Sequence, residues 1–590
     1  MDLAELYLQE LKLLKESSKV FSEDYPAITE SINRDIIDPD VDMILQGVSY
    51  LTAQFKKELD DQFPVALQAL SQVLTPTLMQ PIPAVSILSL TPKANLISPL
   101  TVRKGTSFDS LPINLDEDGV DQISCRFSSA WPIEVLPLNI ADVSVSKVEK
   151  IVEDLPSTVL ELRVGFTSDK NDLANYHFDK LSFYINQSPS DASVWLQMLS
   201  QKLISITLTQ GASSVILPTD NIRLSGFATD RNVFDASNTS NQHSILQEYY
   251  VLPEKLQFFE LDLNQWQQRN GTQFSITFQF QLPNWHLPDI NAEHLKLYCA
   301  PVMNEFEHYA EPTAMNSVQL DFALTAKHRN LSIPVNLPIV DVLSVESIKR
   351  ERERNKIYRN IVKPRSTFAS NKGGFYHYRK HGVHDGEVSN WLALQFESGM
   401  RPHGQEVLRV KLKCCHGDIA ATIPPNKLNV STSSSPELVS FTNLTTSSDY
   451  LPAQIVSNEA WQVMSDQAIS LQNIESAEQL KLVLQHHIPV QLKNTAKHKT
   501  LEHRIEAINS VQIKPKDHFE NGLLIRGTEY LVSINSENFV NQGESFLFSC
   551  LIDQLLALQI PINSFSQLIV TESRSGESQS WPMNFGGMTR

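Results

Sequence analysis

The stretch that decides the fold reads Phe274-Ser275-Ile276-Thr277-Phe278-Gln279-Phe280, in which apolar and polar side chains alternate at every step. Successive side chains of a β-strand point to opposite faces of the sheet. The alternation therefore predicts a strand with one face in a core and the other face toward water.

Similar segments recur on both sides of this strand. They are short, apolar and bounded by turn residues, and little helical pattern lies between them. This regular spacing predicts β-sandwich or barrel-like modules in residues 81–335. The expected strands are Ala84–Leu90, Val159–Phe166, Leu181–Ile185, Leu203–Leu208, Phe274–Leu282 and Leu295–Tyr298.

Residues 336–590 carry both kinds of pattern, and no internal repeat of fixed period is present. Strands are expected at Val407–Cys414 and Glu529–Ile534, and helices at Glu459–Ile469, Ala477–Gln485 and Gly543–Leu558. The sequence thus predicts an α+β multidomain chain. Its three regions are a helical region at 1–80, a β-rich region at 81–335 and a mixed α+β region at 336–590.

The first 80 residues show helical periodicity. Asp38 and Pro39 provide the start signal of a helix, because an Asp side chain can cap free amides and Pro tolerates the first turn. One apolar stripe then continues for about five turns. It comprises Val41, Leu45, Val48, Leu51, Phe55 and Leu59. Two interpretations remain open at this point: a self-contained helical domain, or a bundle that another chain completes.

Composition and charge disfavour several classes of protein. The 590 residues include 49 Lys+Arg and 67 Asp+Glu, a formal net charge of -18, which repels polyphosphate and disfavours nucleic-acid binding. Five cysteines are too few for a disulfide framework in a chain of this length. No apolar run approaches the ~20 residues of a membrane helix, and the N-terminus lacks signal-peptide features. We expect a soluble intracellular protein without direct membrane insertion.

Catalytic signatures are absent from the sequence. It contains no G-x-x-x-x-G-K-[ST] phosphate loop, no G-x-G-x-x-G turn, no G-x-S-x-G nucleophile elbow and no H-E-x-x-H zinc motif. The expectation is therefore no enzymatic activity, no catalytic residue and no cofactor.

Three groups of residues resemble metal sites at first sight. His377, His381, His384 and Asp385 are close in sequence, but the glycines around them favour a solvated loop. Cys414-Cys415-His416 places adjacent thiols on opposite faces of a strand, which disfavours one shared ion. The run Asp116–Asp121 lacks calcium-loop spacing and is interpreted as an exposed turn. No metal is expected.

A basic island stands out in this acidic chain. Residues 349–356 read Lys-Arg-Glu-Arg-Glu-Arg-Asn-Lys, and Arg359, Lys363 and Arg365 follow. Two interpretations are a solvated helix face and a docking surface for an acidic protein, since opposite potentials steer assembly. Under the second interpretation, the partner-binding residues are Arg350, Arg352 and Arg354.

The run Leu246-Gln247-Glu248-Tyr249-Tyr250-Val251-Leu252-Pro253-Glu254-Lys255-Leu256-Gln257-Phe258-Phe259 resembles a signature of the TssF family (also called VasA or ImpG). On its own chemistry we interpret it as a strand entering a core through a rigid turn, with Tyr249, Leu252 and Phe258 packing and Glu254 or Lys255 satisfying backbone or an opposite charge.

Further motifs follow in the family's order along the chain. They are Asp38-Pro39-Asp40-Val41, Lys104-Gly105-Thr106, Cys125-Arg126-Phe127, Trp131-Pro132-Ile133, Cys299 to Phe306, Ala310-Glu311-Pro312, Arg526-Gly527-Thr528-Glu529, Asn563-Ser564-Phe565 and Trp581-Pro582. The chain departs from the family at Cys414–Ile419, where a Thr-Asn-Arg/Lys-Asp-Leu type of turn is usual, and at Gly373–His384.

The resemblance implies a structural role in the baseplate of a bacterial type VI secretion system. Two TssF copies and one TssG form a wedge, wedges surround the VgrG spike, and further contacts involve TssK, TssE and the sheath and tube. It also implies a fold similar to wedge proteins of contractile phage baseplates and a cytoplasmic location at the inner-membrane complex. The alternatives are a subunit of a phage or phage-derived contractile tail, and an enzyme with an unrecognised site.

Overall fold

The computed structural model describes residues 7–8, 11–14, 43, 46–54 and 80–586. Gaps within the last range fall at 116–119, 153–154, 169–171, 176, 235–240, 268, 316–319, 329–330, 333, 350–355, 362–373, 383–387, 397–405, 422, 454–473, 475, 493–494, 521 and 559. The chain divides into two compact units, Met1–Thr75 with Ile455–Met464, and Pro76–Gln454 with Ser465–Arg590. Most described residues belong to the second unit.

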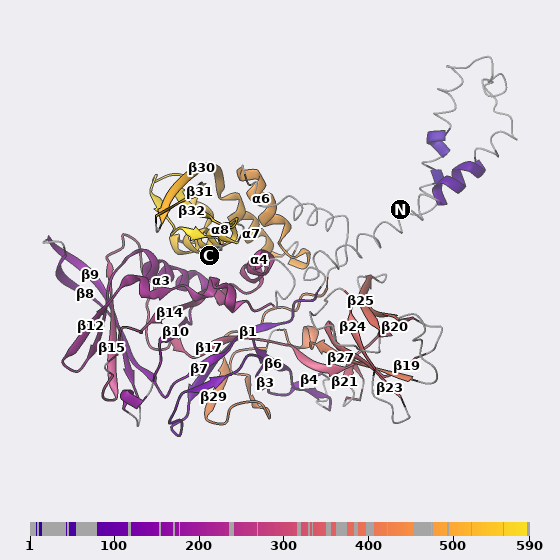
Figure 1. The fold of residues 1–590 in the computed structure, drawn as a ribbon, viewed down its shortest axis with the longest axis horizontal. Helices are drawn as coiled ribbons and strands as arrows, with labels where there is room; N and C mark the ends of the chain where they lie inside the picture. The colour runs from indigo at the N-terminus through magenta and orange to yellow at the C-terminus, as the bar shows by residue number, and fades with distance from the viewer. Residues whose placement is uncertain are drawn as a thin grey trace, which may run out of the picture. The chain divides into compact units, whose positions relative to one another are not determined.

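A six-stranded antiparallel sheet in the second unit brings together strands that are distant in sequence (Figure 1). Its strand order is β28-β3-β6-β17-β1-β29. Three separate stretches of chain therefore meet in one sheet, and the other sheets are built from the segments between them. The bounds are β1 Val85–Pro92, β3 Ser107–Ser110, β6 Arg126–Ser129, β17 Cys299–Met303, β28 Leu428–Ser431 and β29 Val439–Asn443.

The long segment between β6 and β17 forms two sheets and two helices. A five-stranded sheet has the order β12-β11-β15-β9-β8, and a four-stranded sheet has the order β13-β14-β10-β16. The bounds are β8 Asn139–Val152, β9 Leu155–Thr167, β10 Lys180–Ile185, α3 Pro189–Gln201, β11 Leu203–Gln210, β12 Ser213–Leu217, β13 Ile222–Arg223, α4 Asn241–Val251, β14 Phe258–Asp262, β15 Gln273–Gln281 and β16 Leu295–Leu297.

The segment between β17 and β28 forms an eight-stranded sheet with a core of its own. Its order is β18-β27-β23-β24-β25-β26-β20, with β19 paired to β27. Inward side chains such as Phe322, Leu392 and Leu412 form this separate cluster. The bounds are β18 Phe306–Tyr309, β19 Thr313–Met315, β20 Asp321–Leu324, β23 Ile339–Lys349, β24 Lys356–Asn360, β25 Phe375–Gly382, β26 Val388–Gln395 and β27 Glu406–Cys414.

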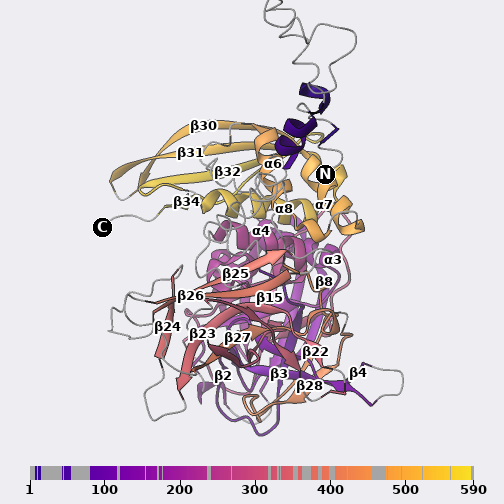
Figure 2. The ribbon, with the colours of Figure 1, turned by 90° about the vertical axis from the view of Figure 1, so that its right-hand side faces the viewer.

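The C-terminal part combines helices with a sheet of order β30-β31-β32-β33, to which β34 adds beside β32 (Figure 2). Helix α8 connects β31 to β32, which pair in parallel, as a crossover connection requires. The bounds are α6 Ala477–His486, α7 Ala496–Glu506, β30 Ile508–Glu520, β31 Leu523–Ile534, α8 Gln542–Ala557, β32 Ser564–Glu572, β33 Ser578–Ser580 and β34 Asn584–Phe585.

Short two-stranded pairs complete the described part. They are β2 Leu100–Val102 with β7 Ile133–Val135, β4 Ile113–Asn114 with β5 Gln122–Ile123, and β21 Lys327–His328 with β22 Val335–Asn336.

Helix starts follow from local chemistry in the C-terminal part. Ser476 and Gln479 form a capping box at α6, and the side chains of Thr495 and Asn541 accept backbone N–H groups at the starts of α7 and α8. Each cap satisfies a donor that a helix N-terminus leaves unpaired. The same Asn541 side chain donates to the Ser190 carbonyl oxygen at 2.9 Å, so the cap also ties α8 to α3.

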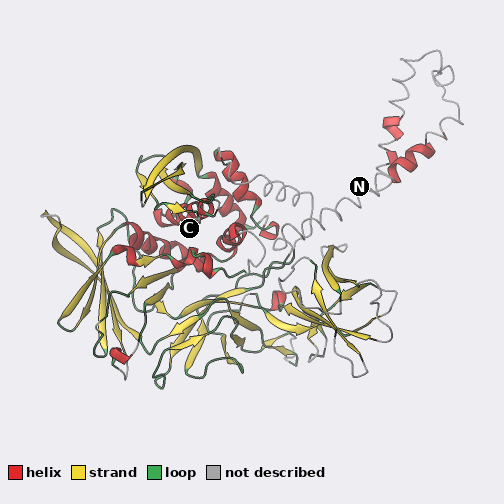
Figure 3. Ribbon diagram, in the orientation of Figure 1, coloured by secondary structure: helices red, strands yellow, loops and turns green. Residues whose placement is uncertain are grey.

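The described architecture confirms the coarse fold class, a β-rich chain with few helices (Figure 3). The decisive stretch is β15, paired with β9 and β11. The expected N-terminal helical bundle is not supported: within residues 1–80 the structure describes only 7–8, 11–14, 43, 46–54 and 80, and the stretch 46–54 is helical. The helix expected at Glu459–Ile469 lies outside the described residues.

Candidate functional site

The segment Leu246–Phe259 folds as helix, tight turn and strand. Its first part belongs to α4, the 3-10 helix η5 spans Pro253–Gln257, and β14 begins at Phe258. The expectation of a strand is therefore wrong up to Val251 and correct from Phe258 onward. Pro253 explains the break, because it lacks the N–H group that a continuing helix would need.

A buried ion pair closes this segment on itself. The Lys255 ammonium donates to the Glu248 carboxylate, and each side chain is only 2% exposed. The other carboxylate oxygen, Oε1, accepts from the backbone N–H groups of Val233 at 2.6 Å and Phe234 at 3.2 Å. A buried charge is tolerated only with a partner and saturated hydrogen bonds, and this pair has both. The predicted role of Lys255 against an opposite charge is confirmed.

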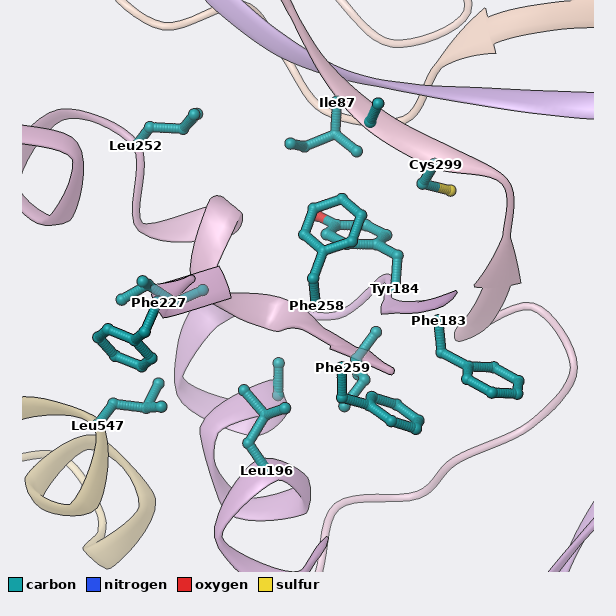
Figure 4. Close-up of a cluster of buried hydrophobic side chains, with 14 of the residues drawn as sticks. Ile87, Phe183, Tyr184, Leu196, Phe227, Leu252, Phe258, Phe259, Cys299 and Leu547 are labelled. Carbon is teal, nitrogen blue, oxygen red and sulfur yellow. The ribbon is translucent and has the colours of Figure 1, made fainter. Parts of the chain in front are cut away.

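The aromatic side chains of the segment are packing residues, as predicted. Phe258 is 1% exposed, and its ring lies 4.8 Å from Tyr184 and 5.2 Å from Trp131 between centroids. Figure 4 shows Phe258 beside Tyr184, with Leu252 nearby. Tyr249 and Leu252 are also buried. The segment therefore packs through its side chains against β10 and against the turn that follows β6.

The same segment also contacts the C-terminal part. The Tyr250 hydroxyl donates to the Leu484 carbonyl oxygen of α6 at 2.8 Å, and the Tyr249 ring lies 6.3 Å from that of Phe548 in α8. Figure 4 shows Leu547 of α8 near Phe227. Burial holds the pKa of the Tyr250 hydroxyl well above its ordinary value, so it remains a neutral donor. The signature is thus a packing centre between parts of the second unit that are distant in sequence.

The Cys414-Cys415-His416 turn has a structural explanation. Both thiols are buried, and desolvation raises the pKa of each to about 12, so neither is a thiolate. The Asn304 side-chain Oδ1 accepts from the His416 backbone N–H at 2.7 Å, and Asn304 Nδ2 lies 3.0 Å from His416 Nδ1. Asn304 also donates to the Arg126 carbonyl oxygen at 2.8 Å. The turn therefore joins the end of β27 to the six-stranded sheet.

His377 and His381 do not lie in the solvated loop that we expected. His377 and His381 lie on β25, which pairs with β26 along its whole length. They are four residues apart on one strand, so about 13 Å separates the positions. His384 and Asp385 lie outside the described residues. Among the described side chains, no group of His, Cys, Asp and Glu is arranged to hold a metal ion.

The described part of the basic island is strand, which corrects the helix-face interpretation there. Lys349 ends β23, Lys356 begins β24, and the two strands pair antiparallel. Lys356 Nζ lies 3.2 Å from Oε1 of the buried Glu406, so this lysine serves the fold. Arg350, Arg352 and Arg354 lie between these strands, outside the described residues. The acidic run follows β4, and its residues 116–119 are also outside them.

Of the N-terminal stripe, Val48 and Leu51 lie in the described helical stretch 46–54. They are 43% and 61% exposed, respectively. Val41, Leu45 and Phe55 lie outside the described residues. The stripe and the basic island therefore remain predictions as partner-binding sites. The searched residues contain no helix long and apolar enough to cross a membrane.

Sequence reasoning missed two groups of residues at these sites. An opposite charge was predicted for Lys255, but its partner Glu248 was missed, because it lies seven positions away through a turn, which no periodicity reveals. The Asn304–His416 contact joins segments more than a hundred residues apart. The one available signal for this contact is that Asn304 lies in the motif Cys299 to Phe306, which resembles the family.

A chain of several β-sheets, whose most distinctive segment serves packing, belongs to the class of multi-module β-rich proteins. The family comparison makes this specific: residues 1–588 match the family described as "Type VI secretion system, TssF", and the chain belongs to that family. The predicted resemblance and the predicted function, a structural component of the type VI secretion system baseplate, are confirmed.

Individual relatives agree with this assignment. The chain is 22% identical over 624 residues to the "Type VI secretion system component TssF1" of Pseudomonas aeruginosa, covering 98% of each chain. Its fold matches a chain of a TssK-TssF-TssG baseplate subcomplex solved by cryo-electron microscopy, with TM-score 0.74, 21% identity, 92% of this chain and 99% of that one. A chain of the type VI secretion system baseplate complex matches with TM-score 0.59 and 17% identity over 100% of both.

Proposed function

We propose that this chain forms a wedge with TssG, two copies to one TssG, and that wedges surround the VgrG spike and support assembly of the contractile sheath and tube. The observation that carries the proposal is the match of residues 1–588 to the TssF family model. A fold shared with a chain of a TssK-TssF-TssG subcomplex supports it. TssK and TssE are the further partners proposed.

The proposed role is architectural, without enzymatic activity, cofactor or nucleic-acid partner. Its place is the cytoplasmic side of the inner-membrane complex. A buried packing centre in the signature segment supports this role, because its carboxylate, ammonium and aromatic groups are engaged with each other and with backbone. The proposed domain organisation has three regions, at 1–80, 81–335 and 336–590.

The proposed TssG contact is the apolar stripe of the N-terminal region, Val41, Leu45, Val48, Leu51 and Phe55. Its described members Val48 and Leu51 are large apolar side chains exposed on a helix, and leaving such a stripe in water is unfavourable. A partner helix that covers the stripe would remove this cost by knobs-into-holes packing.

Co-expression with TssG tests this contact. Val48→Asp and Leu51→Asp place a charge on the stripe without disturbing a core, so each should abolish co-purification while the circular dichroism of the chain is unchanged. Ile216→Asp is the matched control, because Ile216 is 72% exposed on β12. Wild-type recovery of TssG with either stripe variant would exclude the stripe as the contact.

The second proposed contact is the basic island, with Arg350, Arg352 and Arg354 facing an acidic surface of TssK, TssE or a neighbouring wedge. Charge contacts of this kind act on association rate and salt dependence more than on final affinity. Arg352→Glu with Arg354→Glu should slow association at low salt and leave TssG binding intact. Equal rates for variant and wild type with every partner would refute this contact.

A further inference from the structure

A small pocket lies where α3 packs against α8 and the C-terminal sheet (Figure 1). Its empty volume is about 480 Å³ with the open mouth included, which falls within the usual range of ligand sites. The buried side chains of Ile534, Phe546 and Val570 form its apolar part. Its charged residues are Glu572 and Glu577, and no described Lys, Arg or His lines it. An anionic ligand is therefore disfavoured, because nothing in the described lining would compensate its charge.

Glu572 is held in its charged form beside this pocket. Its carboxylate accepts hydrogen bonds from the hydroxyl groups of Ser536 and Ser575. The bond from Ser536, and then that from Ser575, lower the pKa of the Glu572 carboxyl, and Arg574 adds to this effect. The Arg574 guanidinium itself pairs with Glu537, and neither residue lines the pocket. A carboxylate offers about four lone-pair sites, so Glu572 can accept further donors from a ligand.

Gln197 supplies a second acceptor, which the fold leaves unused. The residue is 2% exposed and lines the pocket from α3. Its Nε2 donates to Gln201 Oε1 at 3.1 Å, whereas its Oε1 has no hydrogen-bond partner among the described residues. The orientation of the amide follows from the next bond, because Gln201 Nε2 donates to Gln579 Oε1 at 2.8 Å and so presents its oxygen to Gln197. A buried acceptor without a partner is unfavourable, and a donor bound in the pocket would remove that cost.

The two acceptors define which group would fit. Glu572 belongs to β32 and Gln197 to α3, so they line the pocket from different elements. A guanidinium presents five N–H donors in one plane and can reach acceptors on several sides at once. It is also less strongly hydrated than an ammonium, so it loses less on entering a partly apolar pocket. The apolar part formed by Ile534 and Phe546 suits the methylene stem that carries such a group.

We propose that this pocket binds a guanidinium group on an alkyl stem, with the guanidinium at Glu572 and Gln197 and the stem on Ile534 and Phe546. Such a group belongs to free guanidino compounds and to the arginine side chains of other proteins. The recognition chemistry is the same for both sources, and the experiment below separates them. The inference does not rest on the proposed wedge or on any partner proposed above.

The test titrates the full-length chain with butylguanidine in a calorimeter, and with butylurea as the uncharged ligand of nearly the same shape. We expect a dissociation constant of about 1 mM or below for butylguanidine, as suits a small ligand, and a value at least about tenfold higher for butylurea. Glu572→Gln should weaken the binding of butylguanidine at least about fivefold. Glu478→Gln is the matched control, because it removes the same charge from an exposed side chain of α6, and it should stay within about twofold.

Gln197→Met tests the second acceptor. It removes the unpartnered oxygen and keeps the length of the side chain, so the circular dichroism should be unchanged while butylguanidine binds at least about threefold more weakly. Hydrogen exchange adds a readout of position, since bound butylguanidine should slow the exchange of amides in 534–537 and 572–579.

A Gly-Arg-Gly peptide with blocked ends separates the two sources. Binding as tight as that of butylguanidine supports an arginine side chain of a partner, and exclusion of the peptide supports a free guanidino compound. No binding of butylguanidine up to about 10 mM would overturn the inference, as would equal affinity for butylurea. Wild-type affinity in Gln197→Met would also overturn it, and this variant decides the matter if Glu572→Gln does not fold.

Discussion

Replacing Lys255 with methionine removes the cation from the buried pair and keeps most of the side-chain volume. Glu248 then stays behind as a carboxylate that is 2% exposed and has no opposite charge beside it. Breaking a buried pair from one side costs about 3–5 kcal/mol, because the remaining charge is desolvated without compensation. Val233 and Phe234 still donate their N–H groups to Oε1, so we expect the lower end, about 3 kcal/mol.

The double variant Glu248→Gln with Lys255→Met provides the decisive comparison. The glutamine side-chain oxygen can still accept the two backbone N–H groups, but no unpaired charge remains buried. The double variant should therefore be more stable than Lys255→Met alone, although it carries one more substitution. Two independent local losses would instead add and leave the double variant less stable.

Urea unfolding followed by tryptophan fluorescence measures both variants against wild type. The dependence on urea grows with the surface exposed on unfolding and is at least about 3 kcal/mol per molar for a unit of this size, so a loss of about 3 kcal/mol lowers the unfolding midpoint by up to about 1 M. An unchanged midpoint for Lys255→Met would show that the pair contributes nothing to the fold. A double variant that is no more stable than the single one would refute the argument from buried charge.

Three further predictions concern packing and pH. Phe258→Ala should cost about 3–5 kcal/mol of unfolding free energy because the side chain is 1% exposed. The control Phe519→Ala, at a position 74% exposed, should change this free energy by less than about 0.5 kcal/mol. Urea titrations measure both variants. Burial lowers the pKa of His416 to about 3, so the unfolded state takes up the proton first as the pH falls. The free energy of unfolding should therefore fall by about 1.4 kcal/mol per pH unit below pH 6.5. His416→Gln should flatten this dependence in urea titrations at a series of pH values. Gly543→Ala should lower the melting temperature, since an added Cβ would lie 2.5 Å from the Ser193 carbonyl carbon and α3 would have to move. A melting temperature equal to that of wild type would show that α3 and α8 separate freely.

The strands were the most predictable part of the fold. Alternation along Phe274–Phe280 and Val407–Cys414 is a direct consequence of one buried and one exposed face, and both segments are strands in the structure. Helix α8 was predictable for a different reason: its apolar run is too long for an ordinary strand, and Asn541 provides an N-cap at its start.

The errors arose where tertiary contacts override local pattern. Tyr249 to Leu252 reads as a strand because its side chains are large and apolar, yet a helix buried on most sides has the same composition. At β25, the flanking glycines indicated a loop, although Tyr376, Tyr378 and Lys380 alternate inward as strand residues do. Contacts such as Asn304 with His416 depend on topology, which one sequence without its relatives does not provide.

The six-stranded sheet has a consequence for synthesis on the ribosome. Its strand β1 pairs with β17 on one side and with β29 on the other, so its two partners leave the ribosome long after it does. Until Asn443 has been made, one edge of β1 has no partner, while the inserted sheets can already fold from contiguous chain. The nascent protein therefore holds an apolar strand that lacks one partner through most of translation, and this delay exposes an aggregation-prone edge that the finished fold covers.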